Sequence, residues 1–389
     1  MTSFVKNILA SIRRASCQEG SLALHAPSVG SLEKEYVTDC LESSWVSSSG
    51  KYLDQFEAEL GLFTGIKHVI CCVNATAGLH ASLLGLVVQA GEEVLLPAFS
   101  FVATANAIMH ANATPHFVDI SLNNLGIDPD RLDVYLADIV YFKGNLPYNR
   151  HTDKKISALI VVHCFGYPAS MEKISRVCKK YDIPIIEDAA EALGSYYQGK
   201  HVGNVGLISV LSFNGNKILT TGGGGAILTN DDALALKIRH LISTAKEPHP
   251  WEYNHDRLGY NYRLPNLNAA LGAAQIKRLP SFLKSKAILH ARYQAEFLKF
   301  PDVELFKGGS DSVSNHWLNT IILSPSVAHY QQEILEKAHK EEINLRPIWK
   351  MLPKQTHLQC CPKMDLSNAE SLESRVINLP SSPYLVSND

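Results

Sequence analysis

The feature that most constrains this chain is a regular alternation of short apolar runs with helical patterns between Lys67 and Asn230. Most runs are apolar throughout rather than at every second residue, which indicates strands buried on both faces, as in a mainly parallel sheet covered by helices. The predicted strands are His68–Val73, Glu93–Leu96, Pro115–Asp119, Ala158–Val162, Ile183–Glu187, Ile208–Phe213 and Ala226–Thr229. The helical patterns between them include Gly78–Val88, Phe101–Ala111 and Met171–Tyr181. This order predicts a doubly wound α/β core.

Further elements are expected on both sides of the core. Upstream, Leu53, Phe56, Leu60 and Phe63 recur at helical spacing and predict an amphipathic helix. Downstream, the expected elements are the helices Pro265–Leu279 and Phe282–Lys299, a small α+β unit from about Asn315, and a last helix near Ala369–Asn378. The polar segment Tyr141–Lys155 is interpreted as an inserted surface loop.

The length bounds the number of domains. A chain of 389 residues is long for a single core. We therefore expect an N-terminal segment (1–30), a large α/β domain (31–280) and a small C-terminal α+β domain (281–389).

Charge and cysteine content argue against several classes of protein. The formal net charge of −2 offers no electrostatic footprint for nucleic acid or an anionic membrane, and no apolar run is long enough for a membrane span. In Met1–Ala15 the arginines follow the apolar residues, the wrong order for a signal peptide. The eight cysteines form no Cys-x-x-Cys pair. We therefore expect a cytoplasmic protein without a metal site.

A lysine on a tight turn at a strand end is the first candidate for chemistry. Lys217 ends the segment Ser212-Phe213-Asn214-Gly215-Asn216-Lys217, and Asp188 follows the apolar strand Ile183–Glu187. Such a pair suits an enzyme that holds pyridoxal 5′-phosphate (PLP), because a lysine amine can form a Schiff base with it and a carboxylate can keep its pyridine nitrogen protonated. Taken singly, Lys217 could be a solvated loop charge and Asp188 the N-cap of a following helix.

Other residues that follow predicted strands fall at the edge where open α/β sheets bind ligands. Asn74 and Thr76 begin a helix whose N-terminal N–H groups favour an anion, although either residue could be an ordinary N-cap. Phe101 could lie flat on a cofactor ring, or it could be a core phenylalanine. Ser212 could donate to a phosphate, and Glu191 could reach the phenolic oxygen of the cofactor.

Two other phosphate-binding motifs do not fit. Ile218 follows the lysine, where a P-loop has serine or threonine. The run Gly222–Gly225 precedes a predicted strand rather than a helix, so it is no dinucleotide-binding fingerprint.

Together these segments resemble the DegT/DnrJ/EryC1/StrS family of PLP-dependent sugar aminotransferases, over about Ser31 to Pro383. The matching stretches are Phe56-Glu57, Asn74–His80, Pro97–Ala107, Glu187–Gly194, Ser212–Gly225 and Gly259–Ala270. Within the family the chain is most similar to aminotransferases of UDP-linked 4-keto sugars in legionaminic acid and bacillosamine pathways, through Trp45–Gly50, the insertion near Asn145–Asp153, Ser212–Lys217 and Ile377–Pro383. The resemblance implies an aspartate-aminotransferase type fold (fold type I).

The resemblance also implies roles for single positions. Lys217 would carry the cofactor and shuttle protons, Asp188 would hold the pyridinium, and Phe101 would stack on the ring. Asn261 would contact the phosphate of the neighbouring subunit's cofactor, which implies a homodimer with shared active sites. The remaining implied contacts are Ala75, Thr76, Glu191 and Ser212 to the cofactor, and Trp45, His316 and Arg346 to the sugar nucleotide. The last three could also be ordinary packing residues.

Two positions depart from the common family pattern. Ala75 replaces the usual glycine, but alanine keeps the N–H group that a phosphate needs. Glu191 stands where many members have Gln or His, which alters hydrogen bonding to the phenolic oxygen and marks the subgroup.

The chain is thus predicted to be a homodimeric transaminase. The expected reaction moves an amino group from an amino acid, with L-glutamate favoured, to the C4 ketone of a UDP-4-keto-6-deoxy-HexNAc. A GDP-4-keto-6-deoxy sugar (perosamine type) is the main alternative substrate. The alternative of another class is a PLP-binding regulatory protein without turnover. A PLP dehydratase on the same scaffold is disfavoured, because that subgroup has histidine in place of the lysine.

Overall fold

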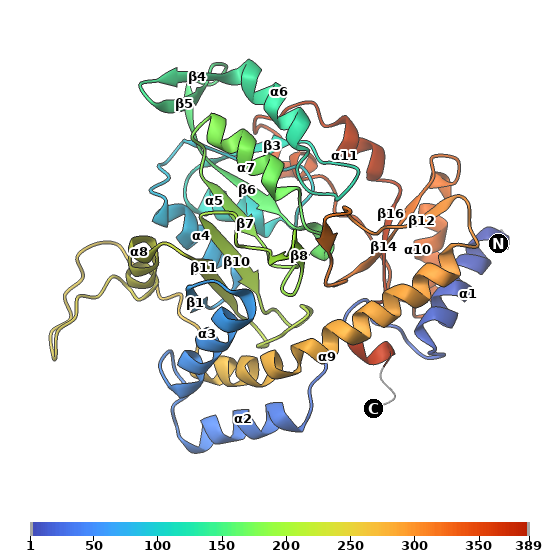
Figure 1. Ribbon diagram of the computed structural model, residues 1–389, viewed down its shortest axis with the longest axis horizontal. Coiled ribbons are helices and arrows are strands. Elements are labelled where there is room, and N and C mark those ends of the chain that lie inside the picture. The colour runs from blue at the N-terminus through green and yellow to red at the C-terminus, as the bar shows by residue number, and fades with distance from the viewer. Residues whose placement is uncertain (1–2, 387–389) are drawn as a thin grey trace.

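The computed structural model describes residues 3–386, and a large twisted sheet lies at its centre (Figure 1). The strand order is β1-β11-β10-β7-β6-β2-β3. The strands are β1 (His68–Cys72), β2 (Glu93–Pro97), β3 (Thr114–Val118), β6 (Lys154–Val162), β7 (Ile185–Asp188), β10 (Ile208–Ser212) and β11 (Gly225–Thr229). All neighbouring pairs from β10 to β3 are parallel, and only β11 runs antiparallel to its neighbours β1 and β10. The predicted mainly parallel α/β core is confirmed.

Both faces of this sheet are buried, which explains the continuous apolar runs. In β6, Leu159 and Val161 belong to one apolar core, whereas Ala158 and Ile160 belong to the other. One core contains residues of α4 (Ala75–Gly85), α5 (Ala103–His110) and α8 (Asp232–Ile242). The opposite core contains residues of α3 (Lys51–Thr64), α6 (Pro129–Ile139), α7 (Met171–Lys180) and α9 (Asn266–Phe297). A strand between two layers of helices has no polar face, so its sequence cannot alternate.

Local capping groups set where several of these helices begin and end. Asp128 accepts hydrogen bonds from the N–H groups of Asp130 and Arg131 at 3.0 Å and precedes a proline at the start of α6. Asp231 caps α8 in the same way, through the N–H of Leu234 at 2.9 Å. Gly65 ends α3 in the left-handed region, with φ of 71°.

The two helices expected downstream of the core form one long helix, α9, so this prediction was wrong. Pro280 lies inside the helix and removes the N–H that would reach the carbonyl of Ile276. Packing on both sides of the proline offsets the loss, because Leu279 and Phe282 are buried in the large core and Leu289 in the small one. Near its start α9 approaches α3 closely at Gly272, where a Cβ would come within 2.7 Å of the Phe56 ring. In Figure 1 α9 runs from beneath α3 to α1.

The segment expected to be a surface loop is a β-hairpin instead. Its strands are β4 (Val140–Lys143) and β5 (Leu146–Asn149), and β5 also pairs with β6. Gly144 takes a φ of 62° in the two-residue turn, a conformation that favours glycine. The polar composition therefore reflects an exposed hairpin at the sheet margin.

A second, antiparallel sheet has the order β12-β14-β16-β15. Its strands are β12 (Val303–Leu305), β14 (Asn319–Leu323), β15 (Arg346–Pro347) and β16 (Val376–Leu379). The helix expected near Ala369–Asn378 is only partly present: α11 (Ser367–Leu372) is followed by the buried strand β16. Tertiary pairing explains the difference, since Val376 and Ile377 lie opposite Ile322 and Ile321 of β14.

Helix α1 (Ser3–Ser16) packs on this second unit together with α10 (Gln331–Lys340). Val5, Ile8 and Ile12 of α1 share an apolar core with Leu289 and Tyr293 of α9. Further elements are α2 (Ser31–Glu42) and a small sheet of β8 (Tyr196–Tyr197), β9 (Lys200–His201) and β13 (Ser312–Val313). The division into three segments remains a prediction.

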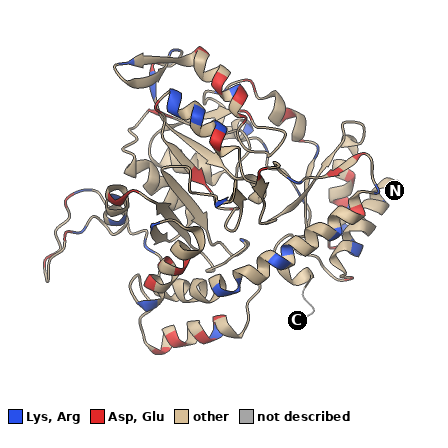
Figure 2. Cartoon of the chain, viewed as in Figure 1, with Lys and Arg blue, Asp and Glu red and all other residues tan. Residues whose placement is uncertain are grey.

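Acidic and basic residues are mixed on surface helices such as α2 and α6 (Figure 2). Among residues 3–386, no helix is both long enough and apolar enough to cross a bilayer.

Candidate active site

A cavity of about 690 Å³ lies where the large sheet meets the second sheet. It opens at the carboxyl ends of β7 and β10, the edge at which open α/β sheets bind ligands. The predicted site residues that line it are Ala75, Thr76, Phe101, Asp188, Glu191, Ser212, Lys217 and Arg346. The fold thus brings together eight positions drawn from both sheets, from the start of α4 and from the loops that follow the strands.

Lys217 enters the cavity from the turn after β10. The turn is closed by hydrogen bonds from the N–H of Lys217 to Asn214 O and from the N–H of Thr221 to Phe213 O, both of 2.9 Å. The lysine side chain is 12% exposed, and its Nζ lies 3.2 Å from Oε1 of Glu191. The amine is therefore held in a mostly dry position and still faces the cavity.

Asp188 ends β7 and is the buried carboxylate of the site. Its Oδ2 accepts a hydrogen bond from Thr104 Oγ1 at 2.7 Å, and its Oδ1 accepts one from the N–H of Ala190 at 3.2 Å. Burial raises the pKa of Asp188, while Thr104, the Ala190 N–H and Lys217 act in the opposite direction. The residues that follow form turns, so Asp188 does not cap a helix.

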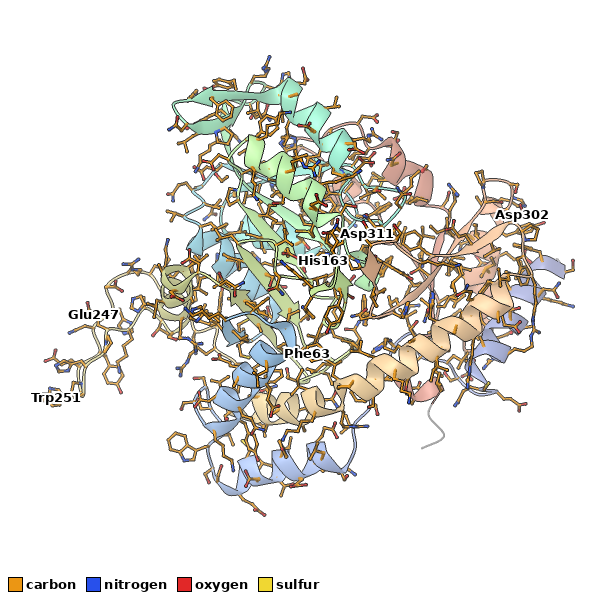
Figure 3. All side chains as sticks on the ribbon, viewed as in Figure 1. Phe63, His163, Glu247, Trp251, Asp302 and Asp311 are labelled. Carbon is orange, nitrogen blue, oxygen red and sulfur yellow. The ribbon has the colours of Figure 1, made fainter. Side chains whose placement is uncertain are left out.

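The neighbouring acid, Glu187, has a structural role. Its Oε2 accepts hydrogen bonds from His163 Nε2 at 2.9 Å and from the N–H of Gly203 at 2.7 Å. The N–H of Ala169 donates to His163 Nδ1, so the proton of this ring lies on Nε2. His163 lies near the middle of the molecule, as Figure 3 shows. Successive residues of a strand face opposite ways, which leaves Asp188 to face the cavity.

The beginning of α4 is the candidate phosphate site. Asn74 is the N-cap, since its Oδ1 accepts the N–H of Ala77 at 2.8 Å. The N–H groups of Ala75 and Thr76 precede the first intrahelical donor and are available to an anion. Ser212 pairs with Gly225, and a Cβ on Gly225 would approach Ala75 N to 2.8 Å. The serine hydroxyl is thereby brought to the same helix end.

Glu191 is the second buried carboxylate of the cavity. Oε2 accepts the N–H of Phe165 at 2.8 Å, and Oε1 faces Lys217. Burial raises its pKa, and Lys217 opposes that shift. Phe101 is 57% exposed and lines the cavity, so one ring face is available to a ligand.

The residues present fit PLP. Asp188 is a buried carboxylate whose charge is only partly compensated, as its raised pKa indicates, and a protonated pyridine nitrogen supplies the missing cation. A free helix N-terminus with two hydroxyl residues suits the phosphate, and an amine that faces the same space suits the aldehyde.

Three predicted positions lie elsewhere in the chain's own fold. Asn261 lines a separate cavity of about 440 Å³ with Ser48 and Lys246. Trp45 is 63% exposed in the loop after α2. His316 has a φ of 50° and stacks on His290 with ring centroids 4.0 Å apart. Their roles toward cofactor or substrate remain predictions.

The structure adds residues that the sequence did not single out. Thr104 donates to Asp188, and Trp317 places its ring beneath the Lys217 amine, 3.9 Å from the ring centroid. Lys350 and Asn378 line the cavity near Arg346. Thr104 lies within the matching stretch Pro97–Ala107, and Trp317 follows His316, but which of the neighbouring side chains faces the cavity depends on tertiary packing.

Comparison with known proteins agrees with this geometry. The model of the DegT/DnrJ/EryC1/StrS aminotransferase family matches residues 27–389. The chain is 33% identical to a GDP-perosamine synthase of Vibrio cholerae, over 94% of this chain and 95% of that one. It is 35% identical to the UDP-4-amino-4,6-dideoxy-N-acetyl-beta-L-altrosamine transaminase of Campylobacter jejuni, over 75% and 74% of the two chains. The solved structure of Helicobacter pylori PseC, an aminotransferase involved in the biosynthesis of pseudoaminic acid, superposes with a TM-score of 0.83 at 28% identity, over 92% and 93%.

A doubly wound sheet whose carboxyl edge presents a lysine, a buried carboxylate and a free helix N-terminus defines a PLP-dependent aminotransferase of fold type I. The names of two of the matched relatives refer to nucleotide-linked sugars. The chain belongs to the DegT/DnrJ/EryC1/StrS aminotransferase family.

Proposed function

We propose that the enzyme transfers an amino group from L-glutamate to the C4 ketone of a UDP-4-keto-6-deoxy-HexNAc. The observation that carries the proposal is the convergence of Lys217, Asp188 and the N-terminus of α4 on one cavity, which Arg346 and Lys350 also line. Two cations beside a cavity suit the diphosphate of a sugar nucleotide. The relative that acts on a UDP-amino sugar, and the resemblance to that subgroup, favour uridine.

The side chains that line the cavity have separate roles in the proposed reaction. When bound, PLP supplies an electron sink that stabilises negative charge on the carbon that loses a proton. Asp188, fixed by Thr104, holds a positive charge at the pyridine nitrogen. Lys217 gives and takes the proton at the reacting carbon, because a single amine beside that carbon can act as both acid and base. Glu191 and the surrounding apolar walls keep the amine in place and water out.

A GDP-4-keto-6-deoxy sugar is the second candidate substrate, because the Vibrio cholerae relative is a GDP-perosamine synthase of similar identity. Incubating the purified protein with glutamate and a panel of UDP- and GDP-linked 4-keto sugars, with mass detection, separates the two. We expect a product only with the UDP-HexNAc substrates. A GDP product alone would contradict the uridine assignment. A cofactor spectrum that glutamate leaves unchanged would contradict catalysis and favour a regulatory binder.

A homodimer is part of the proposal. The segment 244–258 extends away from the body beside α8 (Figure 1), and Trp251 lies at its far end (Figure 3). Trp251, Tyr253 and Leu258 are each at least 76% exposed, an apolar surface that a soluble monomer rarely presents. Asn261 follows this segment and lies outside the cavity of its own chain. A second copy would cover the segment and could bring Asn261 to the partner's cofactor.

Mixing two inactive variants tests the shared site. In a hybrid of Lys217→Ala and Asn261→Ala subunits, one of the two sites contains only intact residues. With free exchange, about a quarter of the wild-type activity should return, because half of the dimers are hybrids.

The matched control mixes Lys217→Ala with Asp188→Asn, whose altered residues belong to the same cavity. This mixture should stay inactive, because every site keeps one lesion. If subunit exchange is demonstrated and only the control behaves as expected, Asn261 serves its own subunit.

Replacement of Arg346 tests sugar-nucleotide recognition. Arg346 borders the cavity at the edge of the second sheet, opposite Asn378. We expect Arg346→Ala to raise KM for the keto sugar about tenfold or more, the loss expected for one charge-assisted hydrogen bond, and to leave the glutamate half-reaction almost unchanged. Arg346→Lys should recover part of the loss. Equal damage to both half-reactions would show a structural role.

A further inference from the structure

Trp317 makes two contacts with the lysine turn that no role has yet explained. The face of its ring lies under the Lys217 amine, with 3.9 Å from Nζ to the ring centroid. Its indole Nε1–H donates a hydrogen bond of 2.8 Å to the carbonyl of Asn216, the residue just before the lysine. The side chain is 4% exposed and lines the cavity. One residue of the second unit therefore holds both the amine and the backbone of the proposed cofactor lysine.

The position of Trp317 is itself tightly determined. Its N–H donates to Asn315 Oδ1 at 2.8 Å, and Asn315 Nδ2 donates to the carbonyls of Glu191 and Leu193, both at 2.9 Å. On the other side, the buried Nζ of Lys286 donates to the carbonyl of Trp317 at 3.1 Å. The indole is thus anchored to the segment that carries Glu191, so its distance to Lys217 is set by the fold.

An aromatic face interacts selectively with a cation. The ring quadrupole attracts an ammonium but not a neutral amine, and the attraction is stronger when water is excluded. Three titratable groups also bear on the Lys217 amine: Glu191 at 3.2 Å, Asp188 at the end of β7, and the buried ring of His25 from the N-terminal segment. The two carboxylates also belong to the proposed cofactor site, whereas Trp317 contacts the lysine turn through both its ring face and its N–H, and its ring lies near that of His25, with 6.4 Å between the ring centroids.

We propose that Trp317 is a positioning residue for amino transfer: its ring face holds the free, protonated amine of Lys217, and its N–H fixes the turn that carries the lysine. The inference rests on the proposed role of Lys217 in the reaction. A lysine that is released from the cofactor must stay close to the reacting carbon, take the proton that this carbon loses, and keep that proton until it is returned. The Trp317 ring below the amine and Glu191 beside it hold the amine in one position, whereas a flexible, solvated lysine would sample many positions.

The test measures how firmly the Lys217 amine is held in the cofactor-free protein. The rate at which acetic anhydride acetylates Lys217 is followed by mass spectrometry at one fixed pH. We expect Trp317→Leu to raise this rate several-fold, because the amine loses the ring face that attracts its charged form and covers it on one side. Trp317→Phe keeps a ring face and should react nearly as slowly as the wild type. Its single-turnover rate should nevertheless fall several-fold, because the tie to Asn216 is lost.

The matched control is Trp349→Leu, the same change at a tryptophan that lines the same cavity. The Trp349 ring packs against Phe165, with 4.6 Å between the ring centroids. The acetylation rate at Lys217 in this control should equal that of the wild type. If Trp317→Leu does not fold, Trp317→Met provides a second variant without a ring. An unchanged acetylation rate in the ring-free variant, or an equal rise in Trp317→Phe and Trp317→Leu, would overturn the proposal.

The experiment also separates this proposal from the proposed function. If the cofactor is found on another lysine, the assignment of Lys217 fails. The acetylation rates would still report whether Trp317 holds the Lys217 amine. If the cofactor is on Lys217 and the acetylation rates do not change, only the role of Trp317 fails.

Discussion

Replacing Lys217 by arginine is expected to reduce amino transfer by at least about a thousandfold, since the variant loses both the bond to the cofactor and the proton carrier. Arginine keeps a cation beside Glu191, so the buried carboxylate is not left unpaired and the fold should persist. Alanine should abolish activity equally but destabilise the protein more. Single-turnover kinetics with glutamate, and thermal unfolding of the cofactor-free protein, measure the two effects.

The covalent assignment has its own control. Borohydride reduction of the loaded enzyme, followed by peptide mapping, should label Lys217. Lys350 is a second lysine that lines the cavity, so it is the natural competitor. A label on Lys350, or full activity of Lys217→Arg, would refute the assignment of Lys217 as the lysine that binds the cofactor.

Asp188→Asn is expected to cost about 3 kcal/mol in the glutamate half-reaction, roughly a hundredfold in rate. The amide cannot hold the pyridine nitrogen in its charged form, so the electron sink is weakened. Thr104→Val removes the hydrogen bond to Oδ2 and the one between Thr104 and Ser100, but it leaves the carboxylate in place and should have a much smaller effect. Near-normal half-reaction kinetics in Asp188→Asn would refute the role.

Stability of the cofactor-free protein separates this electrostatic role from a packing role. Burial raises the pKa of Asp188 above its unfolded value, so the ionised carboxylate costs stability once the pH rises through the folded pKa. Asparagine removes that charge. Asp188→Asn should therefore be at least as stable as the wild type at neutral pH in the absence of cofactor. A clear fall in its melting temperature would indicate that Asp188 mainly supports packing.

The core of the fold and the two central residues were predictable from local patterns. Continuous apolar runs identify doubly buried strands, and the carboxyl ends of parallel strands meet at one edge of a sheet. Asp188 ends β7 and Lys217 follows β10, which is the neighbour of β7. Because these two strands are adjacent and parallel, the two side chains reach the same cavity. This can be inferred without any interatomic distance.

Local signals failed where tertiary packing outweighed them. Pro280 is a helix breaker by its own chemistry, yet it lies inside α9 because both halves of that helix are buried against other elements. Val376 and Ile377 extend what looked like a helix, but they form the strand β16 between β14 and β15. In both cases long-range burial decided the local conformation.

The sequence by itself determined the class of fold and the family, and it predicted the lysine and the aspartate that meet in the cavity, because these depend on periodicity and on motifs within short segments. Only the tertiary structure decided that Trp317 rather than His316 faces the lysine, and that Asn261 lies outside the cavity of its own chain. The bond from Trp317 to Asn216 joins residues 101 positions apart. A contact of that kind depends on how the second sheet packs against the first, and the local sequence around either residue does not predict it.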